Sequence, residues 1–164
     1  MEESITCKSS ALPTVSAIAL CYNHERFLND CLESVKAQNY PKLQIIVTDD
    51  GSRDASPLLI RSWIERNPSL RVTFLRNERN LGLCKTLNRA LSLAQGKYIS
   101  MIATDDVWEA DKLTQQVQAM ESLPEKAGVL YSEAFQIDES GSSLPKRFIE
   151  SHRAFNRMPE GDIR

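Results

Sequence analysis

Short apolar runs alternate along this chain with longer amphipathic stretches. The runs have the length of buried strands, and we expect strands at residues 15–21, 43–47, 72–75, 98–102 and 128–131. Between them, apolar side chains recur at helical spacing over residues 27–35, 54–67, 83–94 and 113–120. Strands that alternate with helices predict βαβ units. They therefore predict a three-layer α/β/α fold around a mainly parallel sheet, as in Rossmann-like nucleotide-binding proteins.

Proline, aspartate and glycine residues mark the edges of the predicted helices. Pro41 ends the first helix because it cannot continue the backbone hydrogen bonds. Asp54 is placed to cap the second helix, whose early turn accepts Pro57. Gly96 is placed as the C-terminal stop of the third helix.

The two ends of the chain lack this alternation. Residues 1–14 begin acidic, without the apolar core of a signal peptide, and we expect them to be a polar lead-in. After Phe135 the pattern weakens into a turn at residues 138–141 and scattered apolar positions. We therefore expect residues 15–164 to form one domain that is incomplete at its C-terminus.

Composition places the chain among ordinary globular proteins. It has 164 residues, of which 41% are hydrophobic and 26% charged, with a formal net charge of -2. These values exclude a disordered or fibrous chain, and no apolar run has membrane-spanning length. The near-neutral charge offers no basic face for nucleic acid, but it allows a local site for a small anion. The four cysteines form no CxxC pair, which favours reduced thiols and a cytoplasmic protein.

Two pairs of adjacent carboxylates follow predicted strands. Asp49 and Asp50 come after the second strand, and Asp105 and Asp106 come after the fourth. Parallel strands end at one edge of the sheet, where ligands of open α/β sheets bind. Two acidic pairs placed there would repel each other unless a cation neutralised them, and Mg²⁺ or Mn²⁺ prefers such oxygen ligands. The sequence thus predicts a nucleotide-plus-metal site.

Each pair also has a simpler interpretation. The stretch from Asp49 to Ser52 has the composition of a plain turn, and Asp105 and Asp106 are suited to capping the helix that follows them. The occurrence of both pairs after predicted parallel strands favours the metal site.

Four segments together resemble one known family. In chain order they are VSAIALCYN, IIVTDDGSRDAS, RNERNLGLCKTLNRAL and GKYISMIATDDVWEADKL. The chain resembles the family 2 glycosyltransferases of the GT-A fold over residues 15–131. The resemblance implies a nucleotide-diphospho-sugar donor, with a UDP-sugar favoured. It also implies inverting transfer with Mg²⁺ or Mn²⁺ to a hydroxyl of a glycan, lipid-linked or protein acceptor.

The resemblance also assigns the base end of the donor site. Tyr22 and Asn23, at the end of the first strand, match the place where the nucleotide base is received. Asp50 would accept a hydrogen bond from the base, and Asp49 is the less certain member of that pair. His24 lies near this end, where an ordinary surface role is expected for it.

At the diphosphate end, Asp105 and Asp106 match the family's acidic motif, one facing the ribose and the other the ion. The common form of the motif is Asp-x-Asp-Asp, and Ala103 replaces its first aspartate, which removes one ligand or one ribose contact. Gly82 lets the backbone turn before the third helix, and Lys85 in the first turn can reach a phosphate. A solvated helix face is the alternative for Lys85.

No motif identifies the catalytic residue. In the family, the carboxylate base comes from a later segment, which we expect this chain to lack; Glu133 and Asp138 are acids outside any motif. A non-catalytic nucleotide-sugar-binding module of the same fold is therefore the alternative function. Relatives that build surface polysaccharides suggest peripheral association of a longer protein with the inner membrane face.

Three other nucleotide- or phosphate-handling folds fit less well. A receiver domain needs its acidic pair after the first strand, where this chain has Cys21, Tyr22 and Asn23. The P-loop motif GxxxxGK[ST] and the dinucleotide motif GxGxxG after the first strand are both absent from the sequence.

Overall fold

The computed structural model describes residues 12–124, 126–138 and 140–148, so most of the predicted lead-in lies outside the described residues. The described chain divides into two compact units, one within Met1–Val117 and the other within Gln118–Arg164. The prediction of a single domain over residues 15–164 stays a prediction.

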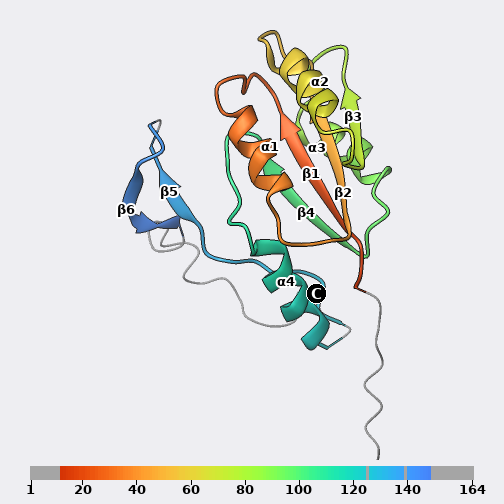
Figure 1. Ribbon diagram of the computed structural model, residues 1–164, viewed down its shortest axis with the longest axis vertical. Coiled ribbons are helices and arrows are strands. Elements are labelled where there is room, and N and C mark those ends of the chain that lie inside the picture. Colours follow the sequence, from red (N-terminus) through yellow and green to blue (C-terminus); the bar gives the residue numbers. More distant parts are fainter. Residues whose placement is uncertain (1–11, 125, 139, 149–164) are drawn as a thin grey trace, which may run out of the picture. The chain divides into compact units, whose positions relative to one another are not determined.

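A parallel sheet forms the centre of the first unit (Figure 1). Among the described residues it has four strands in the order β3-β2-β1-β4, all parallel. The strands are β1 (Val15–Cys21), β2 (Leu43–Asp49), β3 (Val72–Arg76) and β4 (Tyr98–Ala103). The predicted parallel sheet is therefore confirmed.

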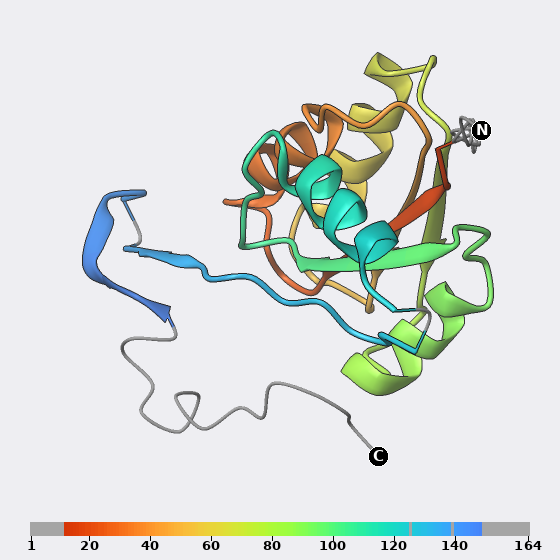
Figure 2. The same cartoon turned by 90° about the horizontal axis from the view of Figure 1, so that it is seen from below.

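Helices cover both faces of this sheet. They are α1 (Leu28–Lys36), α2 (Ser56–Arg66), α3 (Leu83–Leu91) and α4 (Lys112–Ser122), the last of which crosses the boundary between the units. Neighbouring residues of one strand face opposite layers: Ile45 packs with residues of α1 and α2, and Ile46 packs with Ala90 of α3. Figure 2 shows α1 and α2 on one side of the sheet and α3 on the other. The three-layer prediction is confirmed.

Trp63 fills the layer between α2 and the sheet. Its side chain is fully buried in the cluster around Val47 and Leu32, and its indole N–H donates to Glu33 Oε1 at 2.8 Å. Cys21 and Cys31 are buried and free, and burial raises the pKa of Cys31 to about 12, so this thiol stays protonated.

One face of β4 is less covered than its apolar sequence indicates. Ile99 and Met101 lie on the side of α3 and are 46% and 52% exposed, whereas Ile102 on the opposite side is buried. Among the described residues, β4 pairs only with β1. Within the same residues, every helix is too short or too polar to cross a bilayer.

The predicted role of Gly96 is wrong. Helix α3 ends at Leu91 with Ser92 as its cap, well before the glycine. A Cβ at Gly96 would lie 2.6 Å from the backbone nitrogen of Ser16. This glycine therefore lets the chain pass close to β1, a requirement that a helix-stop pattern does not distinguish from capping.

The predicted fifth strand is also wrong. Residues 128–131 form no strand; the second unit instead holds a hairpin of β5 (Phe135–Ile137) and β6 (Ser143–Arg147), paired antiparallel. The turn predicted at residues 138–141 joins these strands, although residue 139 lies outside the described residues.

Candidate functional site

The acidic pairs lie on either side of the end of β1. Asp50 N donates to Cys21 O at 2.9 Å, and Thr104 N donates to Leu20 O at 3.0 Å. Because β1 lies between β2 and β4, the two pairs project from strands about 10 Å apart, which is two strand spacings. The predicted arrangement at the carboxyl edge of the sheet is therefore present.

Asp50 holds the loop that leads into α3. Its Oδ1 accepts hydrogen bonds from Asn77 Nδ2 at 2.7 Å and Leu81 N at 2.8 Å, and its Oδ2 accepts one from Gly82 N at 2.9 Å. Burial raises the pKa of Asp50, but these bonds outweigh it and leave the pKa below its usual range. Both oxygens of this carboxylate already bond to the protein.

Asn77 extends this anchor into the helix. Its Nδ2 also donates to Thr86 Oγ1 at 2.7 Å, and its Oδ1 accepts a hydrogen bond from the Arg89 guanidinium. Gly51 closes the other side, with φ at +72° and space only for hydrogen, because a Cβ would lie 2.4 Å from the Arg79 carbonyl carbon. The turn after β2 and the loop before α3 therefore pack as one rigid piece.

Asp49 is bound differently from its neighbour. Its side chain is 0% exposed; Oδ2 accepts a hydrogen bond from Ser52 N at 3.3 Å and lies 3.4 Å from Arg76 Nε. Its Oδ1 is buried and has no hydrogen-bond partner among the described residues. An unpartnered buried acceptor costs about 1–3 kcal/mol, and because the side chain is 0% exposed, a ligand donor could reach this oxygen only after the residues that cover it moved aside.

The residues after β1 connect its end to the turn after β2. Asn23 has a left-handed backbone with φ at +57°; its N–H donates to Ser52 Oγ at 2.9 Å, and its Oδ1 accepts from Arg53 N at 2.9 Å. Tyr22 beside it is exposed. Asn23 therefore shapes the site through its backbone N–H and its side-chain oxygen. The exposed Tyr22 offers its ring to solvent or to a ligand.

Asp105 and Asp106 are exposed carboxylates in the loop after β4. Partial burial raises the pKa of Asp106, the charge of Asp105 adds to that rise, and the charge of His24 opposes it. A pair of adjacent, mutually repelling hard-oxygen donors fits Mg²⁺ or Mn²⁺. No cluster of three or more His, Cys, Asp or Glu placed for a metal occurs in the described part of the chain, so the remaining ligands would be phosphate oxygens and water.

His24 lies at the ends of β1 and β4, and its ring contacts the residues that follow β4. Its Nδ1 is 3.0 Å from Thr104 Oγ1 and 3.6 Å from Asp105 Oδ1, and its side chain is partly buried. Residues far apart in the sequence make this contact, so no local signal could have identified it. Lys85 lies exposed in the first turn of α3, and both interpretations of it stay open.

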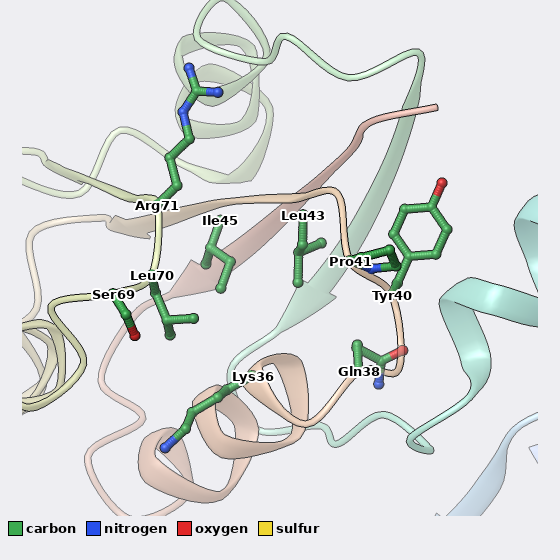
Figure 3. A pocket seen from close by; sticks show the side chains of 9 residues that line it. All are labelled: Lys36, Gln38, Tyr40, Pro41, Leu43, Ile45, Ser69, Leu70 and Arg71. Carbon is green, nitrogen blue, oxygen red and sulfur yellow. The ribbon is translucent and has the colours of Figure 1, made fainter. Parts of the chain in front are cut away.

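A hollow lies at the other end of the sheet (Figure 3). It has a volume of about 290 Å³, and its walls include Leu43 at the start of β2, Lys36 and Arg71. Asp49 ends the same strand at its opposite end. This hollow therefore has no part in the acidic site.

The model of "Glycosyl transferase family 2" matches residues 16–160. TuaG of Bacillus subtilis, whose name assigns it to teichuronic acid biosynthesis, is 33% identical over 108 residues, covering 66% of this chain and 42% of TuaG. The uncharacterized glycosyltransferase MJ1057 of Methanocaldococcus jannaschii is 32% identical over 143 residues, covering 86% of this chain and 48% of MJ1057. The chain thus spans less than half the length of these relatives.

Solved structures show the same fold with donors bound. The mannosyltransferase PcManGT of Pyrobaculum calidifontis, in complex with GDP-Man and Mn²⁺, matches with a TM-score of 0.66 and 26% identity, covering 79% of this chain and 37% of that one. S. aureus TarS 1-349, in complex with UDP-GlcNAc, matches with a TM-score of 0.60 and 26% identity, covering 66% and 31%. The chain belongs to glycosyl transferase family 2 and has the GT-A fold.

Proposed function

We propose that this chain is the donor-binding part of an inverting, metal-dependent glycosyltransferase. The donor would be a nucleotide-diphospho-sugar, most readily a UDP-sugar, and the transferred group a hexosyl or related sugar. The observation that carries the proposal is the buried, unpartnered Oδ1 of Asp49, one strand away from the end of β1 and on the same sheet edge as the Asp105–Asp106 pair.

Asp49 is the better candidate to receive the base. A uracil N–H needs an acceptor with a free lone pair; Asp50 already accepts three of the roughly four hydrogen bonds that a carboxylate can take, whereas Oδ1 of Asp49 accepts none. We therefore assign base recognition to Asp49 and the shaping of the site to Asp50. The sequence-based assignment of the base contact to Asp50 stays a prediction. The two assignments predict a loss of UDP binding from different variants, Asp49→Asn in one case and Asp50→Asn in the other.

The diphosphate and the metal would lie at the other acidic pair. Asp105 and Asp106 would hold Mg²⁺ or Mn²⁺, as PcManGT was solved with Mn²⁺, and Lys85 would contact a phosphate oxygen. Such an ion neutralises the negative charge that develops on the leaving diphosphate, which lowers the barrier by several kcal/mol. The chain's own residues would orient the donor and keep its base in place.

A glycan, lipid-linked or protein hydroxyl is the proposed acceptor, in a cytoplasmic protein of polysaccharide biosynthesis that associates with the inner membrane face. The name of TuaG supports the pathway class. Asp138 is a poor general base, because hydrogen bonds from Ser140 and Ser142 lower the pKa of its carboxyl. The catalytic base stays unassigned.

A non-catalytic sugar-nucleotide-binding module is the second candidate. Ala103 occupies the position where the family's motif begins with aspartate, and the pair that follows it supplies only two carboxylates. A chain of this kind would bind the nucleotide without help from the metal.

Thermal unfolding with added nucleotides tests the proposal. UDP with Mn²⁺ should raise the melting temperature of the wild-type chain, and Asp106→Ala should remove the part of the shift that needs Mn²⁺. Glu109→Gln, which removes an exposed charge from the same loop, is the matched control and should behave like the wild type. No shift with UDP or GDP, with or without the metal, would contradict the proposal.

A further inference from the structure

His24 joins the ends of β1 and β4 through its ring. The imidazole Nδ1 lies 3.0 Å from the hydroxyl oxygen of Thr104 and 3.6 Å from Oδ1 of Asp105. Asp105 itself is 48% exposed at its side chain, so the loop after β4 has little packing to fix that carboxylate. The ring of His24 contacts this carboxylate from a residue whose backbone is fixed by hydrogen bonds to neighbouring elements.

The backbone of His24 is fixed at three points. Its N–H donates to Ser56 Oγ at 3.2 Å, and its carbonyl accepts from Phe27 N and Leu28 N, each at 3.0 Å, where α1 begins. The preceding Asn23 has a left-handed backbone with φ at +57°. The direction in which the ring leaves the chain is therefore set by β1, α1 and α2 together.

Thr104 and Asp105 favour a proton on Nδ1 of His24. The hydroxyl of Thr104 can accept from this nitrogen while it donates to the carbonyl of Leu20 at 3.3 Å, and a carboxylate oxygen of Asp105, 3.6 Å away, can only accept. We therefore assign the proton to Nδ1, with its N–H toward the hydroxyl of Thr104. Donation from a fixed N–H orients a hydroxyl and a neighbouring carboxylate in one preferred arrangement.

We propose that His24 is a positioning residue for the acidic pair. Through Thr104 and the carboxylate of Asp105, it holds Asp105 and Asp106 in the orientation in which they bind the divalent cation with the donor diphosphate. The inference rests on the proposed function. Because Ala103 supplies no carboxylate, two side chains must hold the ion, and their orientation matters correspondingly more. Partners of this kind affect metal affinity by about 10- to 100-fold in known sites.

Two substitutions of His24 distinguish a role in positioning the acidic pair from a role in the stability of the site as a whole. His24→Ala removes the ring. His24→Asn places an amide nitrogen near the former Nδ1, since both atoms are bonded to Cγ, and so retains a donor to Thr104. Asn29→Ala, on the exposed side of α1, is the control. The dissociation constant of UDP is measured by calorimetry with and without Mn²⁺, and Mn²⁺ binding is followed separately by electron paramagnetic resonance.

His24→Ala should reduce the Mn²⁺-dependent gain in UDP affinity at least about 10-fold. Affinity without metal should stay at the wild-type value in every variant, and His24→Asn should recover the gain to within about threefold. If His24→Ala unfolds, Thr104→Val provides the same test, because it removes the acceptor of the histidine and should cause the same selective loss.

An equal loss of affinity with and without metal would overturn the positioning role, as would failure of His24→Asn to recover the gain. An unchanged gain in His24→Ala or in Thr104→Val would do so too. If the wild-type chain bound no UDP at all, or bound it equally well without Mn²⁺, the proposed metal-dependent function would fail, and the role of His24 with it.

Discussion

Asp49 and Asp50 are adjacent carboxylates, yet their replacement by asparagine should affect different properties, stability for Asp50 and UDP affinity for Asp49. In Asp50→Asn, the amide can accept at one oxygen only, so its NH₂ faces the backbone N–H of Gly82. A lost hydrogen bond to a charged group costs about 1.5–3 kcal/mol, and a partly buried unsatisfied donor about 1 kcal/mol or more. We expect a loss of about 2–4 kcal/mol, which lowers the melting temperature by roughly 4–16 °C for a domain of this size.

Asp49→Asn should leave the fold almost unchanged. The free Oδ1 of Asp49 has no protein partner to lose, and the contact with Arg76 involves a half-exposed guanidinium, so it contributes at most about 1 kcal/mol. The new amide donor would face the N–H of the base, however. We expect UDP affinity to fall about 10- to 100-fold, the cost of an unsatisfied donor in the site.

Circular dichroism melting curves and calorimetric UDP titrations on both variants decide between the two assignments. Similar destabilisation by the two substitutions would contradict the division of roles. A stable Asp50→Asn that fails to bind UDP, together with an Asp49→Asn that still binds, would return the base contact to Asp50.

Two further predictions concern the same edge of the sheet. The pKa of Asp50 is lower in the folded chain than in the unfolded chain, where it is about 4. The stability that this difference contributes is therefore present above about pH 4 and is lost as the pH falls through the folded-state pKa. Urea unfolding from pH 2 to 7 should show this contribution in the wild type but not in Asp50→Asn. Gly51→Ala should destabilise by more than about 3 kcal/mol, because strain at positive φ adds to the clash with the Arg79 backbone. Gly82→Ala has the backbone strain of φ +86° and ψ 158° but no clash, so it should cost about 1–3 kcal/mol, less than Gly51→Ala by the same unfolding measurement.

Local patterns predicted the elements that depend on local physics. The first four strands begin where they were expected, because continuous apolar runs such as that of β1 match burial on both faces of a sheet. Gly96 and residues 128–131 were mispredicted, since a close backbone approach and a missing strand partner both depend on distant parts of the chain.

In the candidate site, too, some features follow from local sequence and others depend on distant residues. That both acidic pairs meet at one sheet edge follows from parallel strands alone, and the sequence predicted it. The different states of Asp49 and Asp50 depend on Asn77, which is distant in sequence, and the contact of His24 with Thr104 spans 80 positions. Only the folded chain brings these partners together.

The most direct test of the central claim is whether Mn²⁺ and the diphosphate bind together at Asp105 and Asp106. Calorimetry should show that Mn²⁺ tightens UDP binding to the wild-type chain at least about 10-fold, but leaves the binding of uridine, which has no phosphate, unchanged. The double variant Asp105→Asn/Asp106→Asn should bind both ligands without any effect of the metal. An equal effect of Mn²⁺ on uridine, or a full effect on UDP in the double variant, would contradict the account.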